Sequence, residues 1–150
     1  MKINLWYVLA ALVIYFLFFK GSQKEGFETN QRVKIKTADG KFAKICDEKH
    51  LCLTSTEGEA ETFSVMKFSE DLIALSKGGY YVSSCFGVSC DDFIKVNSFN
   101  PYAPNSKLAL ESDGDNYLVK FYDDKYMSVD DRSNVIKVAG KDQALRVQIV

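Results

Sequence analysis

One sequence pattern occurs three times in this chain, and an internal repeat constrains the fold more than any other feature. Each copy has an apolar pair, a turn with Asp or Gly, and an aromatic residue that begins a strand. The copies begin at Val33, Leu72 and Leu118 and read VKIKTADGKFAKI, LIALSKGGYYVSS and LVKFYDDKYMSV. Their aromatic residues, Phe42, Tyr81 and Tyr126, are 39 and 45 residues apart, and we expect them in the core of the repeats.

Two further strands follow each aromatic residue. One lies beyond a polar hairpin tip, at Leu51–Thr54, Phe93–Val96 and Val135–Val138. The other alternates polar and apolar residues, at 63–65, 108–110 and 145–149, a pattern typical of half-buried antiparallel strands. Four strands in each of three repeats predict an all-β fold for residues 31–150, namely a β-trefoil of a six-stranded barrel capped by three hairpins. A generic antiparallel barrel or sandwich is the alternative.

Short motifs recur at the same points of the repeats. They are Gly40-Lys41-Phe42-Ala43, Tyr80-Tyr81-Val82-Ser83, Lys125-Tyr126-Met127-Ser128 and Glu61-Thr62-Phe63. These motifs resemble the G-K-[FY]-[LMV]-[SA] and E-[ST]-F strands of the fascin-like β-trefoils. The resemblance covers Gln31 to Val150 and implies a trefoil fold without implying a particular activity.

The N-terminal segment is apolar on all sides. From Ile3 to Phe19 only Asn4 is clearly polar, and 17 helical residues span roughly 26 Å, the short end of what crosses a bilayer. We therefore expect a transmembrane anchor helix at residues 1–20 and a flexible spacer at 21–30. A cleaved signal peptide is the weaker alternative, because no small-residue cleavage site follows. The residues expected to form the membrane anchor are Leu5, Trp6, Tyr7, Leu12, Phe16 and Phe19.

Flanking charge predicts the orientation of that anchor. Lys2 alone precedes it, whereas five basic residues follow it: Lys20, Lys24, Arg32, Lys34 and Lys36. Positive charge favours the cytoplasmic side, so the sequence predicts a single-pass membrane protein with its trefoil facing the cytoplasm.

Charge and residue chemistry argue against several functions. The net charge is −1 with no basic run, which excludes a general nucleic-acid binder. The single histidine, His50, is interpreted as an exposed turn residue rather than as part of a Cys–His nucleophile, because no orienting partner is visible. The Asp113–Asn116 run lacks the remaining ligands of a calcium loop. We expect no enzyme activity, no cofactor, no metal and no small-molecule substrate.

The four cysteines form two pairs, Cys46 with Cys52 and Cys85 with Cys90. Each pair flanks a predicted hairpin tip, where facing residues can meet disulfide geometry. Two hairpin disulfides and free buried thiols are equally compatible with the sequence, and neither spacing is the usual C-x2-C of a zinc site. Disulfides belong to oxidising compartments, which conflicts with a cytoplasmic domain unless oxidation is supplied locally.

A long loop, NSFNPYAPNS at 97–106, is the candidate contact surface. It contains Phe99, Pro101, Tyr102 and Pro104, so that prolines restrain its aromatic residues. An insertion without a function is equally compatible with the pattern. The only tryptophan is Trp6, so the Gln-x-Trp motif of lectin-type trefoils is absent, which disfavours sugar binding of that kind.

Two functions remain. A short anchor, a spacer containing Lys24–Glu28 and a small β domain resemble the minor membrane proteins of large icosahedral DNA viruses. That resemblance implies a virion minor capsid protein that links an internal membrane to the capsid shell. Its partners would be the lipid bilayer and other capsid or membrane-associated proteins. The alternative is a cellular, membrane-tethered β-trefoil module that binds a cytoskeletal or other protein ligand.

Overall fold

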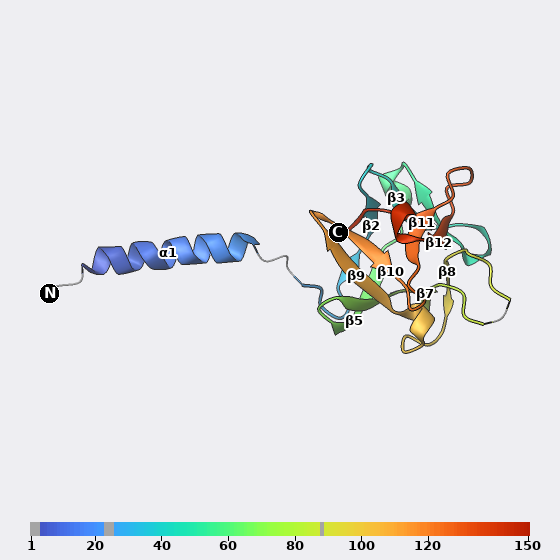
Figure 1. The fold of residues 1–150 in the computed structure, drawn as a ribbon, viewed down its shortest axis with the longest axis horizontal. Coiled ribbons are helices and arrows are strands. Elements are labelled where there is room, and N and C mark those ends of the chain that lie inside the picture. Colours follow the sequence, from blue (N-terminus) through green and yellow to red (C-terminus); the bar gives the residue numbers. More distant parts are fainter. Residues whose placement is uncertain (1–3, 23–25, 88) are drawn as a thin grey trace.

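The computed structural model describes the backbone of residues 4–22, 26–87 and 89–150, and the side chains of these residues except 14–22. One helix, α1 (Leu5–Ser22), precedes a β-rich domain (Figure 1). The strands are β1 (Arg32–Val33), β2 (Ile35–Thr37), β3 (Phe42–Ile45), β4 (Leu51–Thr54), β5 (Phe63–Ser69), β6 (Leu72–Lys77), β7 (Tyr80–Ser83), β8 (Lys95–Ser98), β9 (Leu108–Asp113), β10 (Asn116–Lys120), β11 (Tyr126–Val129), β12 (Ile136–Ala139) and β13 (Val147–Ile149). The predicted all-β fold is thus confirmed for the domain.

Six strand positions close into a barrel. Antiparallel pairs run β1–β5, β5–β6, β6–β9, β9–β10, β10–β13 and β13–β2. Strands β1 and β2 act as one interrupted strand, because Lys34 between them exchanges backbone hydrogen bonds of 2.7 and 2.9 Å with Val150. Closure of the barrel pairs the backbone N–H and C=O groups that an open sheet would leave unpaired at its edge strands.

The other six strands form three hairpins, β3–β4, β7–β8 and β11–β12. The three hairpins meet at Leu51 in β4, Ile94 directly before β8 and Ile136 in β12, all of which are fully buried. The Leu51 amide donates to the Ile94 carbonyl (2.9 Å), and the Ile94 amide donates to the Ile136 carbonyl (3.0 Å). Each repeat therefore contributes one equivalent aliphatic side chain to the centre of the hairpin cap.

The turn before each anchoring aromatic residue contains a residue with positive φ at the same distance from that aromatic residue. Gly40, Gly79 and Asp124 lie two residues before Phe42, Tyr81 and Tyr126, and their φ angles are 91°, 84° and 62°. Glycine adopts positive φ without steric cost, and aspartate tolerates it better than most residues. The Asp/Gly turn signal of the sequence repeat is therefore a backbone requirement that occurs three times.

The anchoring aromatic residues are not equally buried. Phe42 and Tyr126 are buried, whereas Tyr81 is half-buried. Phe27 also joins the core: it is 7% exposed and its ring lies 6.3 Å from that of Tyr117. Phe27 falls within the segment 21–30 that the sequence predicts to be a spacer, and residues 23–25 of that segment lie outside the described residues.

The N-terminal helix overturns the predicted localisation. Among the described residues, no helix is long and apolar enough to cross a membrane. Helix α1 ends with Lys20, Gly21 and Ser22, so its apolar part, Leu5–Phe19, rises only about 22 Å, against roughly 30 Å of bilayer hydrocarbon. The prediction of a single-pass membrane protein with a cytoplasmic, capsid-facing trefoil is therefore wrong.

The residues named for that anchor are only partly described. Leu5, Trp6, Tyr7 and Leu12 are exposed on α1, with 72%, 79%, 75% and 48% of their surfaces accessible. The side chains of Phe16 and Phe19 lie outside the described part, as do residues 1–3 of the predicted segment. Helix α1 extends away from the barrel in Figure 1.

Candidate functional site

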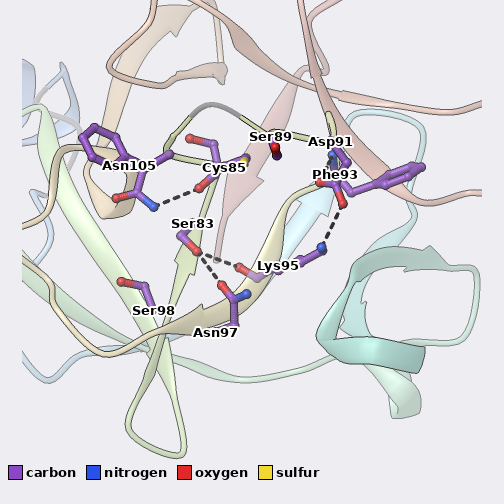
Figure 2. Close-up of a pocket in the computed structure, with 11 residues that line it drawn as sticks. Ser83, Cys85, Ser89, Asp91, Phe93, Lys95, Asn97, Ser98 and Asn105 are labelled. Atoms are coloured by element: carbon purple, nitrogen blue, oxygen red, sulfur yellow. Dashed lines mark hydrogen bonds and ion pairs between the residues drawn. The ribbon is translucent and has the colours of Figure 1, made fainter.

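A polar pocket lies beside the second hairpin, β7–β8 (Figure 2). Its volume is about 360 Å³, within the roughly 300–1,000 Å³ of small-molecule sites. The lining residues come from the end of β7, the loop to β8, β8 itself and the loop before β9: Ser83, Ser84, Cys85, Phe86, Ser89, Asp91, Phe93, Lys95, Asn97, Ser98 and Asn105. Short side chains on the hairpin leave this space open.

Hydroxyl and amide groups form one wall of the pocket. Ser83 Oγ donates to Asn97 Oδ1 at 3.0 Å, which links β7 to β8. Asn105 binds the backbone of Ser84 twice. Its side-chain Nδ2 donates to the Ser84 carbonyl (2.9 Å), and its backbone carbonyl accepts from the Ser84 amide (3.0 Å). These bonds hold the wall in one geometry.

Ser84 itself is the exception within this wall. It is only 5% exposed, and its Oγ has no hydrogen-bond partner among the residues that the structure describes. A buried hydroxyl without a partner costs roughly 1–3 kcal/mol, so proteins rarely retain one without a reason. Ser84 belongs to the wall of the pocket, and its Oγ atom is covered by the surrounding protein.

An ion pair forms the opposite end of the pocket. Lys95 Nζ lies 2.9 Å from Asp91 Oδ2 (Figure 2). The hydrogen bond from Lys95 holds the pKa of Asp91 below its usual value, and the Phe93 amide adds to this effect against the opposing effect of burial. Asp91 is therefore a carboxylate at neutral pH, and the pair adds no net charge to the pocket.

Two phenylalanines supply the apolar surface. Phe93 is half-buried and packs edge-on against His50, with the ring centroids 5.2 Å apart. Phe86 is 63% exposed and packs against Tyr122 at 5.6 Å, and the Tyr122 hydroxyl donates to the Cys85 carbonyl at 3.2 Å. His50 was expected to be an exposed turn residue, but it is half-buried because its ring packs on Phe93.

The chemistry of the pocket is that of binding. It contains hydroxyls, amides, one neutralised ion pair and two aromatic rings. In the described part of the chain, no group of three or more His, Cys, Asp or Glu side chains could hold a metal ion. The arrangement can hydrogen-bond a neutral polar molecule and cover its apolar edge.

The four cysteines occur as two disulfides, Cys46–Cys52 and Cys85–Cys90. Their Cα atoms are 6.2 and 5.4 Å apart, within the usual range of 4.4–6.8 Å. The second bridge closes the loop that carries Phe86 and Ser89, so it lies at the rim of the polar pocket.

We predict that both bridges contribute to stability. Reduction with a dithiol should lower the free energy of unfolding by about 2 kcal/mol per bridge, because each loop is short. Urea denaturation with and without reductant measures this loss, and a variant with all four cysteines replaced by serine should not respond to reductant. Thiol counting provides the second readout: four free thiols in native, unreduced protein would contradict both bridges.

The predicted contact loop exposes its aromatic residues. Phe99 and Tyr102 are 77% and 67% exposed. They nevertheless pack on neighbours, since the Phe99 ring lies 4.9 Å from Tyr80 and the Tyr102 ring lies 5.9 Å from Phe68. Pro104 begins a short 3-10 turn, and Pro101 is half-buried in the loop.

Sequence reasoning missed the polar wall. Ser84 and Asn105 are 21 residues apart, and only the fold brings them together. A local signal was present, because two serines, Ser83 and Ser84, end a strand where the other repeats continue with Lys44-Ile45 and Ser128-Val129. That signal marks an irregular repeat but does not reveal the partner loop.

Comparisons with known proteins identify the fold. No family model and no curated protein matches this chain. The designed threefold-symmetric protein ThreeFoil has a TM-score of 0.64 at 13% identity, covering 77% of this chain and 96% of its own. A lectin from Polyporus squamosus has a TM-score of 0.63 at 9% identity, and the match covers 82% of this chain and 49% of the lectin. A GlcNAcα1-4Gal-releasing endo-β-galactosidase from Clostridium perfringens has a TM-score of 0.64 at 10% identity, and the match covers 79% of this chain and 32% of the enzyme.

At sequence identities this low, the structural similarity shows the fold alone, and that fold is a β-trefoil. The chain spans only 37%, 32% and 17% of the length of three of the solved structures that it matches. None of the three neighbours named above is described as a virion or membrane-anchor protein. The trefoil part of the sequence-based resemblance is thus confirmed, whereas its fascin-like branch stays a prediction.

Proposed function

We propose that this chain is a non-enzymatic binding module whose polar pocket takes a hydroxyl-rich small molecule of the sugar class. The polar lining carries the proposal, because hydroxyl and amide groups surround one space, and the buried Ser84 hydroxyl in its wall has no hydrogen-bond partner among the described residues. Asn97, Ser98 and Asp91 add amide, hydroxyl and carboxylate groups within the same space. Such groups can donate to or accept from sugar hydroxyls, which are both donors and acceptors.

The aromatic residues support the same ligand class. A sugar ring has apolar C–H edges, and Phe86 exposes its ring at the pocket rim. The Polyporus squamosus lectin, a neighbour in fold only, is bound to the sialylated glycan Neu5Acα2-6Galβ1-4GlcNAc. The proposal replaces our expectation of no small-molecule partner, and the ligand site it describes does not depend on a Gln-x-Trp motif.

Ser84→Ala tests the proposal directly. Removing a hydroxyl that has no protein partner should leave the free energy of unfolding unchanged or raise it by up to about 1 kcal/mol. Ligand affinity should fall about 3- to 10-fold, because one hydrogen bond is lost. The probes are methyl glycosides of galactose, N-acetylglucosamine, N-acetylgalactosamine and mannose, titrated into the full chain and followed by NMR.

Ser55→Ala is the matched control, since Ser55 is exposed and does not line the pocket. It should leave both affinity and stability unchanged. Binding by none of the four glycosides would overturn the sugar class. Equal affinities of wild type and Ser84→Ala for a glycoside that does bind would place its site elsewhere.

A second candidate function is docking of a protein partner on the loop at 97–106. The exposure of Phe99 and Tyr102 favours it, because exposed aromatic residues held by neighbouring rings are typical of protein interfaces. A capsid component, as in the virion role inferred from the sequence, is one such partner. This candidate needs no membrane anchor.

Photo-crosslinking tests the docking candidate. A photoreactive phenylalanine analogue at Phe99 should capture a protein in the native host or particle, and Tyr102→Ser in the same chain should reduce the yield at least 5-fold. The same analogue at exposed Tyr122 is the control and should not capture that protein. Equal capture from both positions would contradict a specific role of the loop.

A further inference from the structure

A second hollow lies on the outer face of the barrel. Ala109 on β9 pairs with Leu72 on β6 and with Lys120 on β10. Directly paired residues of antiparallel strands point to the same side of the sheet, and the alternate residues Ile73, Leu108 and Val119 are buried inside. Leu72, Ala109 and Lys120 therefore form one row across the outer face.

The small side chain in the middle of that row creates the hollow. Ala109 stands between a leucine and a lysine, and the space above it measures about 340 Å³. Pro104 completes the hydrocarbon surface, and Phe121, which is only 2% exposed, lies beneath it. We call this space the Ala109 groove; it shares no lining residue with the polar pocket.

The rim of the Ala109 groove is positively charged. Lys107 lies 5.2 Å from the Phe68 ring, and it forms no ion pair with any residue that the structure describes. Lys120 pairs with Asp124 at 3.0 Å, but the Asp124 side chain is 85% exposed. Two lysines against one aspartate leave one positive charge at the rim, beside the hydroxyl-bearing ring of Tyr122.

We propose that the Ala109 groove binds a single-chain amphiphilic anion, such as the carboxylate of a medium-chain fatty acid. Its hydrocarbon chain lies over Leu72, Ala109 and Pro104, and its carboxylate meets Lys107. An uncharged polar ligand would leave the hydrocarbon surface unused. A purely apolar ligand would gain nothing from the unpaired lysine. The volume falls within the range of small-molecule sites.

Titration of the full chain with dodecanoate, kept below its critical micelle concentration, tests this site. Isothermal titration calorimetry should show saturable binding, and the NMR signals of Leu72 and Ala109 should shift. Ala109→Leu fills the groove and should weaken binding at least 10-fold. Lys107→Gln should weaken it about 3- to 10-fold, as expected for the loss of one charge-assisted hydrogen bond. Lys125→Gln, an exposed lysine outside the groove, should bind like wild type.

Four outcomes would overturn the proposal. Dodecanol binding as tightly as dodecanoate would leave no role for the charge. Wild-type affinity in Ala109→Leu would place the ligand elsewhere, for example on the exposed apolar residues of α1. Binding to anionic lipid vesicles without binding to free dodecanoate would indicate a lipid surface. Binding of an acidic peptide alone would indicate a protein partner. Unfolding curves check each variant, and Ala109→Val replaces Ala109→Leu if the larger residue prevents folding.

Discussion

Ile94→Ala is expected to lower the free energy of unfolding by about 2–5 kcal/mol, as large-to-small changes in a packed core do. Ile94 is fully buried where the three hairpins meet. Its backbone also links the repeats, because its amide donates to Ile136 and its carbonyl accepts from Leu51. The cavity left by the missing carbons would lie among these residues, and the closed barrel below gives them little freedom to collapse.

Urea denaturation measures the loss, with Ile94→Val as the graded control at about 0.5–1.5 kcal/mol. Ile136→Ala should cost a similar amount, since it occupies the equivalent position in the third repeat. Ile94 also lies between Phe93 and Lys95, which line the polar pocket, so Ile94→Ala should weaken ligand binding as well. A loss below about 1 kcal/mol for both alanine variants would contradict a shared hairpin core.

Phe63→Ala is expected to cost about 3–5 kcal/mol. Phe63 is fully buried on β5, where it pairs with Val33 and closes the first repeat of the barrel. Phe99→Ala is the matched control, because it deletes the same atoms from a side chain that is 77% exposed. That change should alter stability by no more than about 0.5 kcal/mol.

Thermal and urea unfolding of the two variants separate burial from residue type. The expected order is wild type, then Phe99→Ala close to it, then Phe63→Ala far below. Equal losses in the two variants would mean that the loop at 97–106 belongs to the core. A small loss for Phe63→Ala alone would mean that the first repeat is not packed as described.

The repeat in the sequence predicted most of the domain fold. Strand alternation and the turn before each aromatic residue are local properties, and both recur at Phe42, Tyr81 and Tyr126. The turns require positive φ at Gly40, Gly79 and Asp124, which explains why Asp and Gly mark them. Local signals of this kind can be recognised in a sequence because they depend only on neighbouring residues.

The prediction of a transmembrane anchor was wrong because the apolar part of the N-terminal helix is too short. Composition showed that the segment is apolar, but the polar end of the helix and the bilayer thickness decide whether it can cross. The buried position of Phe27 shows a related limit. Nothing in the polar, glycine-containing sequence around Phe27 indicates that its ring packs against Tyr117, because that contact is made across 90 residues.

The candidate site could not be predicted from the sequence, because its residues come from segments that are far apart in the chain. The sequence by itself determined three β units and their turns, since each depends on residues close together in the chain, and it left two disulfides and free thiols equally open for the cysteines. Only the tertiary structure decided that Asn105 holds the backbone of Ser84, leaving a buried hydroxyl in a pocket, and that Ala109 lies between Leu72 and Lys120. Pockets arise where distant segments meet, so their shape depends on barrel closure and strand register rather than on local pattern.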